Sequence, residues 1–138
     1  MDRIVKSAAL CLVTAAALGC VGGPPLGAQQ PPIKRTDLLK ADLIEMKDSE
    51  MHVWVADVAP NASTGRHAHP TPRFVYVLEG AVVVEVEGMP ARTFKAGQAF
   101  VEMPNQVHNF KNASPSEPAK ALGFQYATKG QPLQTNAP

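Results

Sequence analysis

The sequence predicts an all-β domain, a sandwich or barrel of short strands, and two observations support this fold class. Short segments rich in β-branched and aromatic residues alternate with Gly, Pro and Asn at short intervals, as in small β-sandwiches and barrels. No segment keeps a helical period for more than a couple of turns, and residues 36–43 are the best short candidate for a helix. The expected strands lie at 51–58, 73–78, 81–86, 92–94, 98–101, 107–111 and 120–126.

Glycine-containing turns separate some of these segments from the ones that follow. The strand at 51–58 opens the series, because it is rich in β-branched residues and alternates in part. Glu79-Gly80 ends the strand at 73–78, and Glu87-Gly88 permits a hairpin return from the strand at 81–86. The remaining strands follow at similar short spacing.

The first residues predict an export signal. Arg3 and Lys6 precede an apolar stretch at 8–18 that is too short to span a bilayer as an ordinary membrane helix. We expect cleavage after Ala28, so that residues 1–28 form a signal peptide and the mature protein is periplasmic or secreted. Cys11 and Cys20 would both be lost, and the mature chain would then contain no disulfide.

A lipoprotein signal is an alternative reading of the same segment. Leu18-Gly19-Cys20 has the small residue and the cysteine of such a signal, although its leucine stands one place late. The signal would then end at residue 19, and lipidation of Cys20 would tether the domain to a membrane.

Length and charge indicate one small domain. The 138 residues carry 13 Lys and Arg against 12 Asp and Glu, so no charge excess favours nucleic acid as a partner. Because the Pro- and Gly-rich stretch at 21–32 cannot bury a core, we expect a leader over 29–34 and the folded domain over 35–128. Residues 129–138 lack apolar periodicity and are expected to lie along the surface or fray.

Three of the four histidines suggest a metal site. Residues two apart on a strand point the same way, so His67 and His69 can present both rings to one interior point. His108 would bring a third imidazole from a separate strand. Three such ligands with open positions are typical of a reactive site for a divalent transition metal, here Fe, Mn, Zn, Ni or Cu.

Two segments resemble the two sequence motifs of the cupin superfamily, and the resemblance covers roughly residues 53–126. It implies a cupin-type double-stranded β-helix, that is, a jelly-roll barrel, with a metal on the three histidines. It also implies a homodimer, since cupins commonly pair through barrel edges. The form with an acid ahead of the proline in motif two looks like a subset of small exported cupins. The residues that match the motifs are Gly65, His67, His69, Glu79 and Gly80 in the first, and Gly97, Pro104, His108 and Asn112 in the second.

The sequence departs from the cupin pattern at one chemically important position. Arg73 stands where the family usually has its metal-binding Glu, and a guanidinium cannot ligate a metal. Glu102 is the candidate replacement, because strand alternation turns it inward if Phe100 points into the barrel. A bulge at Met103-Pro104 would instead rotate Glu102 outward and leave three histidines and water.

Three residues are candidates for binding a small-molecule substrate. Arg73 could hold a substrate carboxylate at the barrel mouth, or it could form a salt bridge with a neighbouring acid such as Glu85. Tyr76 and Phe100 could line the ligand pocket, although each could equally be part of the core.

The reaction is less constrained than the site, because the cupin barrel hosts dioxygenases, isomerases, decarboxylases and binding modules. The first hypothesis is a small metal-dependent enzyme, dioxygenase- or isomerase-like, with Glu102 as fourth ligand or general base. A non-catalytic module that binds a small molecule or a metal is the alternative. A third possibility is an inactive site, because Arg73 would repel a divalent cation inside a low-dielectric pocket.

Overall fold

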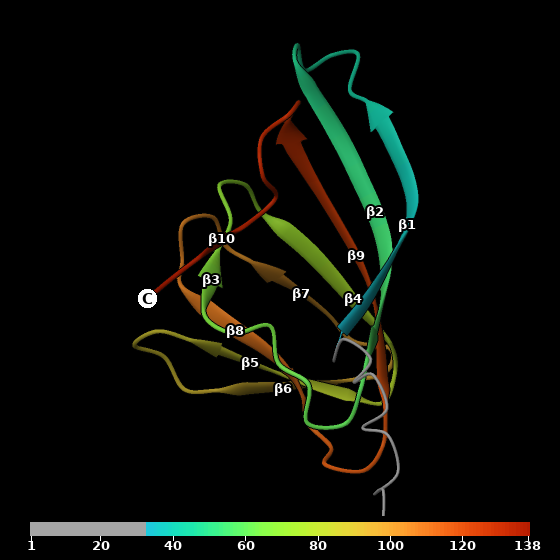
Figure 1. Cartoon of the computed structure of the whole chain (residues 1–138), viewed down its shortest axis with the longest axis vertical. Coiled ribbons are helices and arrows are strands. Elements are labelled where there is room, and N and C mark those ends of the chain that lie inside the picture. The colour runs from blue at the N-terminus through green and yellow to red at the C-terminus, as the bar shows by residue number, and fades with distance from the viewer. Residues whose placement is uncertain (1–32) are drawn as a thin grey trace, which may run out of the picture.

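The computed structural model describes residues 33–138, which fold into two five-stranded antiparallel sheets (Figure 1). The first sheet has the order β1-β2-β9-β4-β7 and the second β10-β3-β8-β5-β6. The described residues include no helix long and apolar enough to cross a membrane. The strands are β1 (Ile33–Asp42), β2 (Ser49–Val58), β3 (His67–Ala68), β4 (Arg73–Glu79), β5 (Ala81–Val86), β6 (Arg92–Lys95), β7 (Ala99–Glu102), β8 (His108–Asn112), β9 (Ala119–Thr128) and β10 (Thr135–Asn136).

The all-β prediction is confirmed, and each of the seven segments expected to be extended contains a strand. The predictions for residues 1–28, including the cleavage site and the lipidation of Cys20, lie outside the described residues, as does most of the leader. Figure 1 shows the long strands β1, β2 and β9 running side by side, with the shorter strands of the second sheet facing them across the core.

The best short candidate for a helix, residues 36–43, is not helical, because residues 36–42 belong to β1. The strand pairs with β2 from Ile33 opposite Val58 to Asp42 opposite Glu50. Its register shifts between Asp37 and Leu39, so the side chains lose strict alternation there. Two adjacent leucines at such a bulge imitate part of a helical period in the sequence, although both are more than half exposed in the structure.

The core lies between the sheets and is built by strand alternation. On β4 the side chains alternate buried and exposed from Arg73 to Tyr76, and Val77 is fully buried. Val82 and Val84 from β5 and Phe110 from β8 meet it from the other sheet. At one end of the barrel, however, the inward positions become polar, and these polar positions form the candidate site.

Residues 129–138 lie along the surface but are held in place. Strand β10 pairs with β3, with Thr135 opposite Ala68 and Asn136 opposite His67. The backbone N–H of Ala137 also donates to the carbonyl of Arg66 at 2.9 Å. The chain end therefore packs beside the strand that carries His67 (Figure 1).

Candidate metal centre

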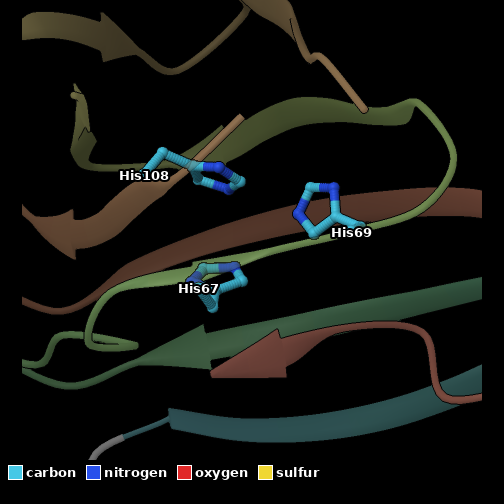
Figure 2. A group of neighbouring side chains, drawn as sticks. All are labelled: His67, His69 and His108. Atoms are coloured by element: carbon cyan, nitrogen blue, oxygen red, sulfur yellow. The ribbon is translucent and has the colours of Figure 1, made fainter. Parts of the chain in front are cut away.

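Three histidines meet inside the barrel (Figure 2). His67 lies on β3 directly opposite His108 on β8, and His69 follows β3. Their ring centres are 4.4 to 5.4 Å apart, and one nitrogen of each ring lies within 4.8 Å of the others. All three side chains are almost completely buried. The structure thus brings together the three rings that were predicted from the sequence to meet.

Two of the rings are oriented by the same local contact. Nδ1 of His67 lies 3.0 Å from the carbonyl of Gly65, and Nδ1 of His108 lies 2.8 Å from the carbonyl of Gln106. Since a carbonyl only accepts hydrogen bonds, each Nδ1 must donate its proton. The lone pair of each neutral ring is therefore on Nε2. Nε2 of His67 has no hydrogen-bond partner, and Nε2 of His108 lies 3.5 Å from Oε1 of Glu102.

The cluster has the donor set that a cation requires. Five buried side-chain atoms there have no hydrogen-bond partner, and an unpaired buried polar atom costs about 1–3 kcal/mol. A first-row divalent cation would take one nitrogen from each ring and the carboxylate oxygen, since these are its usual ligands; the second nitrogen of His69 carries the proton of the neutral ring and does not ligate. The residues present fit such a metal. The five buried atoms without a hydrogen bond are Nε2 of His67, Nδ1 and Nε2 of His69, Oε2 of Glu102 and Nε2 of His108.

Glu102 points into the barrel beside the rings. Its strand pairs with β4 in regular register, Arg73 opposite Glu102, so no bulge turns it outward. Its Oε2 lies 3.2 Å from Nε2 of His69 and its Oε1 lies 3.5 Å from Nε2 of His108. Burial opposes the charged form, but contacts with His108 and His69 and the attraction of Arg73 outweigh it and hold the pKa of Glu102 at about 2.

The histidines respond to the same surroundings in different directions. Burial is the main effect on His67 and His69 and lowers the pKa of both rings, so they stay neutral and able to ligate. Burial also opposes a charge on His108, but the nearby Glu102 carboxylate and the Gln106 carbonyl raise its pKa. A metal would therefore compete with a proton most directly at His108.

Arg73 is buried beside Glu102 and not beside Glu85. Its Nε donates to Oε1 of Gln125 at 3.0 Å, and its Nη2 donates to Oε1 of Gln134 at 3.2 Å. Nη1 lies 3.8 Å from Oε2 of Glu102, and burial lowers the pKa of the guanidinium to about 10. The suggested pairing with Glu85 is wrong, because that carboxylate is on β5 in the other sheet and pairs with Lys111.

Sequence reasoning missed Gln125, a fully buried residue on β9. Its Nε2 donates to Oγ1 of Thr71 at 3.1 Å and to the carbonyl of Leu133 at 2.9 Å, while its Oε1 accepts from Arg73. One signal was available, since Gln125 shares strand parity with Ala119 and Ala121 and is the polar exception on that inward face.

A cavity of about 340 Å³ adjoins the cluster and is lined at this end by Glu102 and Arg73. Trp54 on β2, Arg35 on β1 and Gln134 also line it, and none of these three was expected from the sequence. Because Glu102 both lines the cavity and contacts His69, it joins the cavity to the three rings.

The two aromatic residues expected to line the pocket do not line this cavity. Tyr76 lies on the outer face of β4 and is 39% exposed, because strand alternation turns it to the other face of the strand from Arg73 and Val75. Phe100 does point inward, as expected, but it stacks on Phe94 with ring centres 4.2 Å apart and packs against the core. Both residues instead line a second, more open cavity at β4, β7 and β9, so their role in binding a ligand stays a prediction.

The family model Cupin_2, described as the cupin domain, matches residues 54–124. The chain belongs to this family, and the resemblance seen in its two motifs is confirmed. None of the curated proteins matches the chain.

Solved structures with the same fold include several cupins and enzymes. A cupin-like protein from Thermotoga maritima is 24% identical, with a TM-score of 0.63, over 76% of this chain and 75% of that one. The DMSP lyase DddQ from Ruegeria pomeroyi is 19% identical, with a TM-score of 0.54, over 65% of this chain and 44% of that one. An oxalate oxidase is 20% identical, with a TM-score of 0.54, over 77% of this chain and 55% of that one. At these identities the likeness shows the fold alone.

Proposed function

We propose that the protein is a metal-dependent enzyme for a small molecule, dioxygenase- or isomerase-like, with Fe, Mn, Zn, Ni or Cu held by His67, His69 and His108. The observation that carries this proposal is that one nitrogen from each of three buried rings lies within 4.8 Å of the others, with the buried carboxylate of Glu102 beside them. A structural role alone would leave these atoms unsatisfied, at a cost that a bound cation removes.

Glu102 is proposed as the fourth ligand. It lies within 3.5 Å of the ring nitrogens of both His69 and His108, and its surroundings keep it ionised. A general base works best with a pKa near the operating pH, so this carboxylate is better suited to ligation than to proton abstraction. When bound, the metal would supply a Lewis acid or a redox centre.

The cavity would supply the substrate site. At about 340 Å³ it is near the small end of the range for ligand pockets, about 300–1,000 Å³. Arg73 at its inner end is held by Gln125 and Gln134, so the guanidinium stays in place for an incoming anionic or oxygen-containing group. Similar folds include an oxalate oxidase and a DMSP lyase, which supports an enzymatic use by analogy of fold only.

A non-catalytic small-molecule or metal-binding module is the second candidate. One observation favours it: among the described residues that line the cavity, Glu102 is the sole carboxylate, and no Cys or Lys nucleophile accompanies it. The inactive-site alternative rests on Arg73, whose charge disfavours protonation of the nearby rings and would also repel a metal.

The first experiment measures metal content. Protein purified from its own export compartment should contain a first-row metal at near one per chain, and no metal above background would contradict the proposal. Wild type loaded with each metal in turn should then be screened for oxygen consumption or substrate loss. The Glu102→Gln variant, which keeps the shape and removes the charge, should lose turnover. Tight ligand uptake without product under every metal would favour the binding module.

Export to the periplasm or the medium is part of the same proposal and rests on residues 1–28. The alternative is a lipid anchor at Cys20. The two predict different masses for the mature N-terminus, either Gln29 or an acylated Cys20, and intact-mass analysis distinguishes them.

A homodimer is also proposed. The outer face of β4, β7 and β9 carries the exposed apolar residues Phe74, Tyr76 and Val101, and Phe74 stacks on Phe124 at 5.9 Å. Strand β7 is the edge of its sheet. An apolar face next to an open edge supports pairing with a second copy.

A further inference from the structure

Two arginines share one wall of the cavity beside Glu102. Arg35 comes from β1 and Arg73 from β4, and both line the cavity. The guanidinium carbon of Arg35 lies 3.6 Å from the centre of a Trp54 ring, and that of Arg73 lies 5.2 Å from it. Both guanidinium groups therefore contact the same indole beside the same cavity, and each cation–π contact helps to hold its guanidinium in position.

The neighbours of these arginines do not neutralise both charges. Arg73 donates to the amide oxygens of Gln125 and Gln134, which carry no charge, and Glu102 lies 3.8 Å from its Nη1. The acid nearest Arg35 is Asp37 at 3.5 Å, whose side chain is 76% exposed. Since an exposed ion pair is weak, Arg35 keeps most of its positive potential on the cavity side.

A bound metal would increase this positive potential. If the histidine cluster holds a divalent cation, Glu102 stands between that cation and Arg73, and one carboxylate cannot balance both. Uncompensated charge is costly in a partly enclosed, low-dielectric space. The charge balance of the occupied site therefore favours an anion in the cavity.

We propose that the cavity binds the carboxylate of a small organic acid between Arg35 and Arg73. Guanidinium matches a carboxylate through two parallel hydrogen bonds. Most of the remaining wall, including Trp54, Val75 and Phe110, is apolar and suits the hydrocarbon or aromatic body of such an acid, although Ser63, Thr64 and Gln134 add polar groups. An apolar body distinguishes this ligand from inorganic phosphate, which has polar oxygens on every side. The assignment deepens the proposed function and rests on it for the charge of the metal.

Calorimetric titration of the metal-loaded protein tests the assignment. The probes are acetate, butyrate and benzoate, with benzamide as the neutral counterpart of benzoate and inorganic phosphate as a second anion. We expect benzoate to bind at least about tenfold more tightly than benzamide, since a hydrogen bond to a charged group is worth about that factor. Arg35→Gln and Arg73→Gln should each weaken benzoate binding by about tenfold and leave benzamide unchanged.

One control variant and the position of Arg35 make the test specific. Arg92→Gln removes an arginine that stacks on Phe94 outside the cavity, and it should bind benzoate like the wild type. Arg35 is one-third exposed and does not contact the histidine cluster, so Arg35→Gln stays informative even if Arg73→Gln fails to fold. Metal content is measured on every variant.

The outcomes separate the two proposals. The carboxylate assignment would be overturned by equal affinity for benzoate and benzamide, by benzoate binding that Arg35→Gln does not weaken, by no binding of any carboxylate, or by phosphate binding tighter than each carboxylate. A wild-type protein that takes up no metal would overturn the proposed function. In that case, a preference for benzoate over benzamide that depends on Arg35 would still support the two arginines as a carboxylate site.

Discussion

The inner and outer faces of strands β4, β7 and β9 differ in an instructive way near the metal centre. The inward residues there are Arg73, Glu102 and Gln125, whereas their immediate neighbours Phe74, Val101 and Phe124 point outward. Polar groups are thus buried and apolar groups lie at the surface, the reverse of an ordinary half-buried sheet. Polar residues in such positions need partners inside, and apolar residues outside need a partner surface, so both faces indicate binding.

The largest expected effect follows from removing the metal proposed to bind on the inner face. Chelation of the metal-loaded wild type should lower its midpoint of thermal unfolding by about 10 °C, because a ligand present at 100 times its Kd adds about 2.7 kcal/mol. Differential scanning calorimetry measures the shift. The triple variant His67→Ala/His69→Ala/His108→Ala should show no chelator effect. His52→Ala is the matched control, because this fourth histidine contacts Glu50 instead, and it should respond like the wild type. A chelator shift that persists in the triple variant would place the metal elsewhere.

Breaking the inner polar network should come next in size. Gln125→Leu removes the acceptor of Arg73 and leaves the oxygen of Thr71 and the carbonyl of Leu133 without their donor. We expect the free energy of unfolding to fall by about 2–3 kcal/mol, measured in urea, since unpaired buried groups cost about 1–3 kcal/mol each. Gln131→Leu, at an exposed position, should change it by less than about 0.5 kcal/mol. Equal stabilities for the two variants would argue against the network.

Crowding the wall of the cavity should have a smaller but more local effect. A Cβ at Gly123 would lie 2.5 Å from ring atoms of Trp54, so Gly123→Ala must displace the indole and cost about 1–3 kcal/mol. Trp54 is the single tryptophan of the chain, so its fluorescence maximum reports this movement directly. Gly88→Ala strains a turn at a φ of +76° but meets no atom within 4 Å. It should lower stability without shifting the emission, and an unshifted emission in Gly123→Ala would refute the displacement.

Substitution on the outer face should change association more than folding. Phe74→Lys/Val101→Lys places two charges on the exposed apolar face, so the proposed dimer should dissociate while the free energy of unfolding of the monomer changes by less than about 1 kcal/mol. Sedimentation velocity measures the change in mass. Ile44→Lys alters a 96% exposed residue in the β1–β2 connection and should leave the dimer intact. Identical sedimentation of all three proteins would count against this face as the interface.

Local spacing in the sequence was sufficient to predict β2 and β4 to β9, whereas β1 and β10 were not predicted as strands. Period-two patterns and glycine turns located these strands. The three histidines were expected to meet because the His-x-His spacing puts two rings on one face of a strand and because His108 falls in the second motif of the cupin resemblance. A bulge disturbs the same local signal at 36–43, the best short candidate for a helix.

The polar surroundings of the trio depend on long-range pairing, which no local pattern specifies. The position of Glu102 was left open until the register with Arg73 was known. Gln125 hydrogen-bonds Arg73 from a strand about fifty positions away, and Arg35 reaches the cavity from the first strand. Tyr76 was expected beside the same pocket, but its strand parity turns it to the outer face of β4, where it lines a second cavity.

The attachment of the chain end to β3 bears on where the protein can be shortened or tagged. Ending the polypeptide after Thr128, at the close of β9, would delete Leu133 and Gln134, and with them one acceptor each for Gln125 and Arg73. A protein fused directly to Pro138 would strain β10, which pairs with β3, the strand that carries His67. A purification tag should therefore be joined through a spacer. If a truncated form loses function, the loss of these end contacts explains it before any change in the chemistry of the site does.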